Sequence, residues 1–175
     1  MTTATDDEAS SLWTFSLDRY GRDGVAETCL WMQERLGVDV NIVLACLHAG
    51  DQRMCISKAL LRAIAEGGPG EWHREVVVPL RRARVFAKWR RDGEDAGPIA
   101  AFRSKVKELE LVAEKWEQRL IERHLDRVAI DTGAQDEARP AIALGNLVHY
   151  LSLVGAEFEG EVEERATRLV RACVS

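Results

Sequence analysis

The chain has 175 residues, of which 46% are hydrophobic and 30% are charged, a composition typical of one soluble globular domain. This excludes fibrous, disordered and membrane-spanning proteins, and a chain of this length buries enough surface to fold without disulfides or a structural metal. The net charge is −5, from 24 Lys and Arg against 29 Asp and Glu, so any affinity for nucleic acid must come from a local patch.

Glycine and proline recur at intervals suited to helices, whereas the short alternating segments of strands are nearly absent, so we predict an all-α fold. Residues 1–10 are acidic and carry no Lys or Arg, so we expect a disordered segment rather than a signal or transit peptide. A first helix then begins with Ser11 as its N-cap and ends at Gly21. A second helix follows at 24–36, where apolar residues recur on one face.

The third predicted helix begins at Asp39, because Val38 before this N-cap and Val43 after it can form a hydrophobic staple. Its residues are apolar on nearly all sides, so we predict that it is the central helix of the fold. Ser57 repeats the capping pattern and begins a fourth helix that ends at Gly67.

A fifth helix begins at Pro69 or Gly70, after a glycine-rich loop, and contains Pro79. A proline inside a helix removes one backbone hydrogen bond, so we predict a bend at 76–80. The alternative is a short extended segment at 76–78.

The next helix carries the strongest periodic signal and is expected to run from about 98 to 130. Its apolar residues alternate at spacings of three and four, as in a coiled-coil seam: Ile99, Phe102, Val106, Leu109, Ala113, Trp116 and Leu120. A loop at 92–97 folds this helix back on the preceding one as an antiparallel hairpin. The seam serves an internal hairpin or a dimer equally well, so the oligomeric state stays open.

Pro140 begins another helix, and a last helix covers 161–173. The uncharged run at 140–156 is shorter than the roughly 20 residues that span a bilayer, so no transmembrane segment is predicted. Together the elements predict a single-domain bundle of seven or eight helices over 11–175, in which 140–175 could form a C-terminal subdomain. The four cysteines contain no Cys-x-x-Cys pair, which favours reduced thiols in the cytoplasm.

Motifs of catalysis and metal binding are missing. None of the four histidines has a glutamate three residues before it, and the His-Glu-x-x-His, Walker and Gly-x-Ser-x-Gly motifs do not occur. We therefore predict no catalytic residue, no metal site and no cofactor. The pattern favours a non-enzymatic protein without deciding it.

A stripe of cations at 81–91 is the most informative local feature. Helical spacing puts four of them on one face, where they could bind an anionic partner such as nucleic acid or a membrane surface: Arg81, Arg84, Lys88 and Arg91. The following helix carries an acidic stripe, Glu110, Glu114 and Glu117, and the hairpin would bring residue 81 level with about residue 109. We favour pairing of the two stripes within the chain.

Two further sets of residues are candidate sites. Aromatic residues crowd the N-terminal helices, so Trp13 and Tyr20, together with Arg19 and Arg22, form a candidate protein-docking patch. A pocket between helices is expected near Asn41 and His48.

These features favour a non-catalytic adaptor, scaffold or regulatory binding protein that binds a protein partner or itself. One alternative is a nucleic-acid-associated protein that uses the cationic stripe. Another is a small-molecule-binding protein or enzyme with a pocket between helices.

The N-terminal half of the chain also carries a recognisable pattern. Residues 12–50 contain Leu-Trp-Thr-Phe-Ser-Leu, Gly-Val-Ala and Asp-Val-Asn-Ile-Val-Leu-Ala-Cys-Leu, and a looser match covers 71–81. This pattern resembles that of a family of short proteobacterial proteins of unknown function. The resemblance implies a bacterial cytoplasmic helical protein, and it implies no catalytic residue or cofactor.

Overall fold

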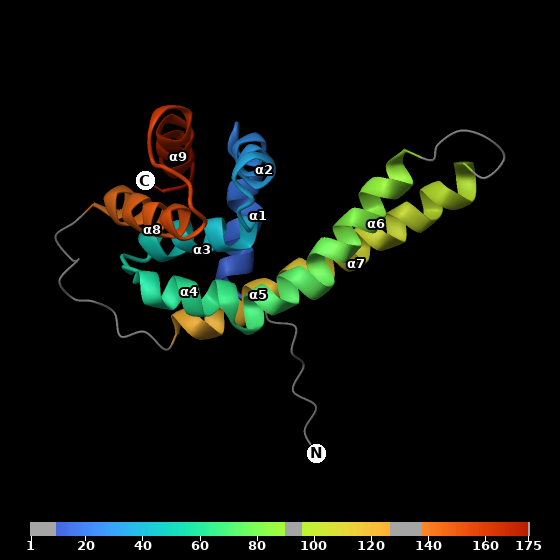
Figure 1. The fold of residues 1–175 in the computed structure, drawn as a ribbon, viewed down its shortest axis with the longest axis horizontal. Coiled ribbons are helices and arrows are strands. Elements are labelled where there is room, and N and C mark those ends of the chain that lie inside the picture. Colours follow the sequence, from blue (N-terminus) through green and yellow to red (C-terminus); the bar gives the residue numbers. More distant parts are fainter. Residues whose placement is uncertain (1–9, 90–95, 127–137, 175) are drawn as a thin grey trace, which may run out of the picture.

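The computed structural model describes residues 10–89, 96–126 and 138–174, and within them it contains helices and no strand. This confirms the predicted all-α bundle. The helices form a globular part and an arm that projects from it (Figure 1). In chain order the elements are α1 Ser11–Tyr20, α2 Val25–Leu36, α3 Val40–Asp51, α4 Lys58–Glu66, α5 Gly68–Trp72, the π-helix η1 His73–Val77, α6 Val78–Lys88, α7 Ala96–Leu125, α8 Arg139–Leu153 and α9 Gly160–Cys173.

The helix starts follow the capping residues of the sequence, with one correction. Asp39 and Ser57 cap α3 and α4 as predicted, because their side chains accept hydrogen bonds from the N–H groups of Asn41 and Leu60. Ser11 does not cap α1. The cap is Ser10, whose hydroxyl accepts from the Trp13 N–H at 3.1 Å, the N3 position that a serine cap normally reaches.

Helix α3 is the central helix, as predicted: every residue from Asn41 to Gly50 is buried. It packs against α8 along its length and also contacts α1, α2 and α7. Residues of α8 and α9, such as Leu147 and Leu169, belong to the same hydrophobic cluster as α3. Helices α3 and α8 approach closely at Gly50, where an added Cβ would lie 2.4 Å from the Cα of Ala143.

Helices α5 and α6 are joined by the π-helix η1 rather than by a simple kink. The Val78 N–H bonds the His73 carbonyl, five residues back, which is the wide turn of a π-helix. Pro79 explains why the π-helix lies just before it. Proline has no N–H to donate, and the proline ring crowds the carbonyl four residues earlier. The alternative of an extended segment at 76–78 is wrong, since these residues are helical.

The predicted antiparallel hairpin is present and forms the projecting arm, in which α6 lies along α7 (Figure 1). Helix α7 ends at Leu125, earlier than expected, and residues 127–130 lie outside the described ranges. The seam is only partly buried: Val106 and Ala113 are buried, whereas Phe102 and Leu109 are 55% and 56% exposed. The reason is the projection of the arm, which leaves α7 with a neighbouring helix on only part of its circumference.

Several expectations fall on residues that the structure does not describe. These are disorder at 1–9, most of the loop at 92–97, and the position of Arg91. Among the described helices, none combines the length and the apolar content that crossing a bilayer requires.

Replacing Gly50 with Ala should destabilise the fold by about 1–3 kcal/mol, because the added methyl group forces α3 and α8 apart. Gly145→Ala is the matched control. Gly145 is exposed within α8 and has no atom within 4 Å of an added Cβ, so alanine there should be neutral or stabilise the helix by up to about 1 kcal/mol. Urea unfolding measures the free energy of unfolding of both variants. Similar free energies for the two variants would contradict the close α3–α8 contact.

Candidate functional site

A groove of about 590 Å³ lies where the arm joins the globular part. Its lining comes from α1, α2, α3, α6 and α7. Apolar side chains such as Leu17 and Leu30 form part of its walls, and the polar residues that line it include Ser16, Asn41 and Gln118.

Arg81 and Arg84 of the cationic stripe border this groove and are engaged within the chain. Arg81 donates to Glu110 at 3.1 Å, to Glu114 at 2.8 Å and to the Gln33 side chain at 2.6 Å, and Arg84 pairs with Glu110. The predicted pairing of the two stripes is therefore confirmed for these residues, near the expected register. Lys88 is exposed, with its ammonium 5.8 Å from the Trp89 ring centroid.

Glu110 illustrates how strongly the arginines act. Burial alone would raise the pKa of this carboxyl group, but hydrogen bonds from Arg84 and Arg81 outweigh burial and lower it. Burial dominates at Glu114, whose pKa is raised even though Arg81 bonds it. The third acidic residue, Glu117, does not join the arginines and lies instead in a separate cluster.

The candidate docking patch is divided by the fold. Trp13 and Tyr20 line the groove. Arg19 and Arg22 point to the end of α9, where they donate to the carbonyls of Cys173 at 2.7 Å and Ala172 at 2.8 Å. Cations at a helix C-terminus satisfy its unpaired carbonyls, so the two arginines anchor α9 to α1.

The candidate pocket is divided in a similar way. Asn41 lines the groove, whereas His48 does not. The His48 ring lies 3.1 Å from the Ser11 hydroxyl and packs against Phe15, with ring centroids 5.1 Å apart. These contacts explain His48 as a residue that joins α3 to α1.

A chain of buried hydrogen bonds leads from the groove into the protein. The Ser16 hydroxyl donates to Gln118 Oε1 at 3.1 Å, and Gln118 Nε2 donates to the side-chain oxygen Oδ1 of Asn41 at 2.8 Å. The Asn41 amide in turn donates to Glu117 Oε2 at 2.8 Å. Polar groups buried in a core need such partners, so this series of hydrogen bonds fixes the orientation of the Glu117 carboxylate.

The chain of hydrogen bonds ends in a cluster of Asp39, His73 and Glu117. His73 Nδ1 lies 3.2 Å from Asp39 Oδ2 and 3.2 Å from Glu117 Oε2. Both carboxylates are buried, and Glu117 Oε1 has no hydrogen-bond partner within the described residues. Burial and the neighbouring Glu117 raise the pKa of Asp39 well above its usual range, burial raises that of Glu117, and burial lowers the pKa of His73.

Sequence reasoning missed this cluster because its members come from three elements. The sequence pattern indicates only a helix cap at Asp39, and the metal motifs that spacing can reveal place the carboxylate and the histidine on one helix. One signal was available: Glu117 lies one turn beyond Glu114 but too far along the hairpin to meet Arg81 or Arg84. The wide turn at η1, which begins with His73, could not be read from the spacing of the apolar residues.

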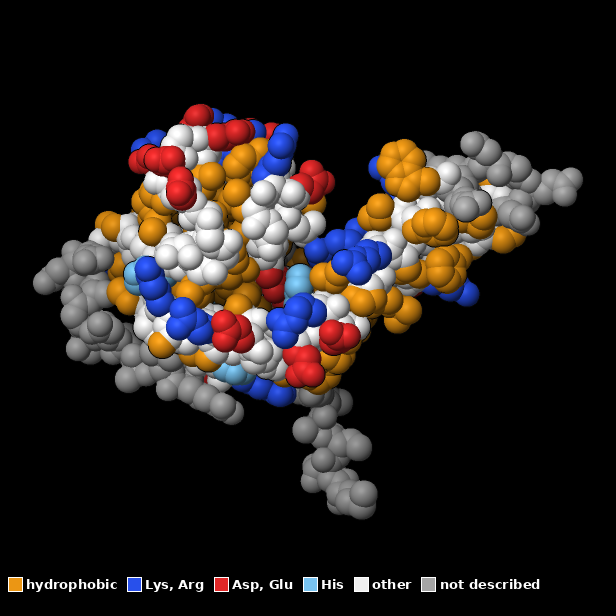
Figure 2. Space-filling view, viewed as in Figure 1, with side chains coloured by type: hydrophobic (Ala, Val, Ile, Leu, Met, Phe, Trp, Pro, Cys, Tyr) orange, Lys and Arg blue, Asp and Glu red, His pale blue; other side chains and the backbone are white. Residues whose placement is uncertain are grey.

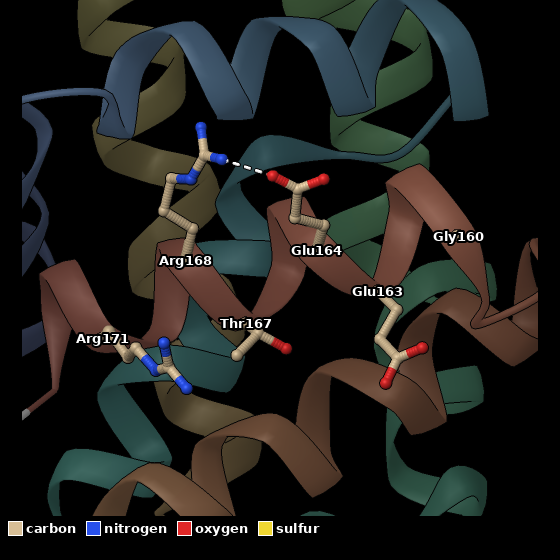
Figure 3. A pocket seen from close by; sticks show the side chains of 6 residues that line it. All are labelled: Gly160, Glu163, Glu164, Thr167, Arg168 and Arg171. Atoms are coloured by element: carbon tan, nitrogen blue, oxygen red, sulfur yellow. Dashed lines mark hydrogen bonds and ion pairs between the residues drawn. The ribbon is translucent and has the colours of Figure 1, made fainter.

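A second depression, of about 420 Å³, lies on the outer surface of α9 (Figure 3). All of its lining residues belong to this one helix, and Arg168 pairs with Glu164 across it at 2.5 Å. Most of these side chains are exposed, so the depression has the character of an ordinary charged helix surface.

The arm presents hydrophobic side chains to solvent (Figure 2). The exposed large hydrophobic residues of α7 are Leu111, which lines the groove, and Phe102, Leu109, Val112 and Trp116, which we call the outer stripe. Phe102, Leu109 and Trp116 follow one another at intervals of seven residues, so they share one face of the helix. Phe86 and Trp89 on α6 are also exposed, by 64% and 76%.

Replacing Glu110 with Gln should destabilise the protein by about 1–2 kcal/mol at neutral pH, because Arg81 and Arg84 lose their charged acceptor. The pKa of Glu110 is lowered in the folded protein, so its contribution is present above the ordinary pKa of glutamate and is lost as the pH falls through the lowered value. The free energies of unfolding of the wild type and the variant, measured in urea, should therefore differ at neutral pH and become equal in acid. Glu34→Gln, at an exposed position of α2, should have little effect.

Comparison with known proteins identifies a family for this chain but assigns it no activity. No curated protein and no solved structure matches the chain. Residues 11–121, more than half of the 175, match the family described as "Protein of unknown function (DUF2390)". This match covers α1 to α6 and most of α7, including the groove, the outer stripe and the Asp39–His73–Glu117 cluster. The chain therefore belongs to this family of unknown function.

Proposed function

We propose that this protein is a non-catalytic helical scaffold that pairs with a second copy of itself through the outer stripe of α7. The observation that carries the proposal is the exposure of large apolar side chains at heptad spacing, with Leu109 56%, Val112 55% and Trp116 39% exposed. Contiguous apolar surface of this kind marks interaction sites, because water solvates it poorly.

The spacing of the outer stripe supports a helix as the occupant. Residues seven apart on one helix pack into the surface of a second helix with the same repeat. Every copy of the chain carries the same stripe, and a two-fold axis brings it against itself. A second copy is therefore a partner whose surface is known to have the required spacing.

An antiparallel arrangement also matches the polar residues around the stripe. If the two-fold axis passes midway between Leu109 and Val112, each Leu109 lies opposite Val112 of the second copy. Trp116 then lies opposite Lys105, and Phe102 opposite Arg119. Cations stack favourably on aromatic rings, as Arg119 already does on Trp116 of its own helix, 5.5 Å from the ring centroid.

Charge complementarity supports the same alignment. Glu108 flanks the stripe on one side of Leu109, and Lys115 flanks it one heptad later. In the antiparallel pair these positions meet across the interface, and symmetry produces the ion pair twice. In a parallel pair the two-fold axis runs along the helices and puts these positions of the two copies on opposite sides of the interface, so Glu108 would not meet Lys115.

Such a dimer would join two arms into a four-helix bundle and hold two globular parts apart. The role that fits this shape is a scaffold. The nucleic-acid alternative has less support, because Arg81 and Arg84 already bond Glu110 and Glu114.

Sedimentation velocity at micromolar concentrations tests the proposal. The wild-type protein should be a dimer, and Leu109→Glu with Val112→Glu should be a monomer with unchanged helical content by circular dichroism, because charge is placed at the centre of the interface. Leu17→Glu is the matched control: Leu17 is 59% exposed but lies on α1, so this variant should stay dimeric.

A charge exchange tests the antiparallel alignment. Glu108→Lys alone should weaken the dimer about 5-fold to 30-fold, and adding Lys115→Glu should restore it, because the exchanged pair has the same complementarity. Two outcomes would exclude the proposed scaffold. One is a wild-type protein that is monomeric over the whole concentration range, and the other is a variant that carries both glutamates in the stripe and is still a dimer.

A further inference from the structure

We infer that Asp39, His73 and Glu117 form a binding site for one divalent transition-metal cation of the first row. The site does not depend on the proposed dimer, because its residues lie where the arm meets the globular part and not on the outer stripe.

Geometry is the first argument. The three side chains come from the N-cap of α3, the start of η1 and the middle of α7, and their ligand atoms all lie within 4.8 Å of one another. His73 Nδ1 is 3.2 Å from an oxygen of each carboxylate. Neighbouring ligand atoms on a cation with bonds of about 2.1 Å lie about 3.0–3.4 Å apart, so the observed spacing suits a shared cation.

The unsatisfied oxygen is the second argument. Glu117 is fully buried at 0% exposure, yet the described residues supply no hydrogen bond to its Oε1. A buried carboxylate oxygen without a donor is costly, and no Lys or Arg ion pair to Asp39 or Glu117 occurs in the described part of the chain. A cation that binds both carboxylates would satisfy this oxygen and neutralise the pair.

The state of the histidine is consistent with ligation. Burial lowers the pKa of His73, which favours the neutral imidazole that a metal requires. Its side chain is 15% exposed, so the cluster is open to solvent at this edge and a cation can enter there.

Neighbouring groups already hold the ligands in place. The Asn41 N–H donates to Asp39 Oδ1 at 2.9 Å, which leaves Oδ2 directed to His73. The Asn41 side chain donates to Glu117 Oε2 at 2.8 Å and is itself held by Gln118. The backbone N–H of Asp39 donates to the Tyr150 hydroxyl at 2.8 Å. Metal sites use such second contacts to orient their ligands.

The donor set decides the class of metal. One imidazole nitrogen with two carboxylates suits Mn²⁺, Fe²⁺ or Zn²⁺, whereas Ca²⁺ prefers six to eight oxygen ligands. The π-helix fits a functional role for His73, because π-turns within helices occur frequently at functional sites.

The test is calorimetric titration of the chelator-treated protein with Mn²⁺ and with Zn²⁺. Wild type should bind one Mn²⁺ per chain, and Mn²⁺ should raise its melting temperature. Glu117→Gln and His73→Gln should bind at least about 100-fold more weakly and show no such rise. Mn²⁺ is the deciding ion, because the thiols of the chain are poor ligands for it.

Two matched variants control for nonspecific effects. Glu34→Gln changes an exposed glutamate of α2, and His149→Gln changes a histidine whose ring bonds a backbone carbonyl. Both should bind Mn²⁺ as the wild type does. If Glu117→Gln fails to fold by circular dichroism in chelator, Asp39→Asn, which keeps the capping oxygen, replaces it.

Two results would overturn the inference. One is wild-type protein that binds neither Mn²⁺ nor Zn²⁺ stoichiometrically, which would mean that the two carboxyl groups share a proton beside His73 instead. The other is Mn²⁺ binding that the ligand variants leave unchanged.

Discussion

The burial of α3 is the constraint on which the rest of the structure depends. A helix enclosed on all sides gains hydrophobic stabilisation but must satisfy every polar group at its ends from neighbouring elements. At its start, Asp39 bonds the Asn41 N–H, and Tyr150 from α8 accepts from the Asp39 N–H. Beyond its end, Asn146 of α8 donates to the Met54 carbonyl and accepts from the Ile56 N–H. Helix α8 is thus joined to both ends of the central helix.

The same requirement explains the polar residues where the arm meets the globular part. Helix α7 crosses the start of α3, and its Glu117 and Gln118 supply partners for Asn41. Once a carboxylate is buried there, its charge needs a donor or a cation. His73, Asn41 and Asp39 surround it, so a requirement of helix packing has created a cluster that can also bind a ligand.

Both ion pairs and apolar contacts hold the two helices of the arm together. Close to the globular part, Arg81 and Arg84 bond Glu110 and Glu114, and these ion pairs fix the register of α6 on α7. Farther out, apolar side chains such as Ala87 and Val106 are buried. The larger residues of α7 remain outside this contact, because two helices cover only part of each other's circumference. Polar contacts thus position the arm, and apolar residues are left available on its surface.

The helical class, most helix boundaries and the central place of α3 are predictable from the sequence. So are the hairpin and the pairing of Arg81 with the acidic stripe. These features depend on caps, on periodicity and on neighbours along one hairpin, all of which are local in the chain. The cap at Ser10, the π-helix before Pro79, the separation of Trp13 from Arg19 and the meeting of Asp39, His73 and Glu117 were decided only by tertiary structure. The outer stripe belongs to both levels, since its repeat is visible in the sequence but its exposure depends on which side of α7 the neighbouring helices cover. The physical reason is that local spacing fixes which residues share a face, whereas the packing of distant helices fixes what that face meets.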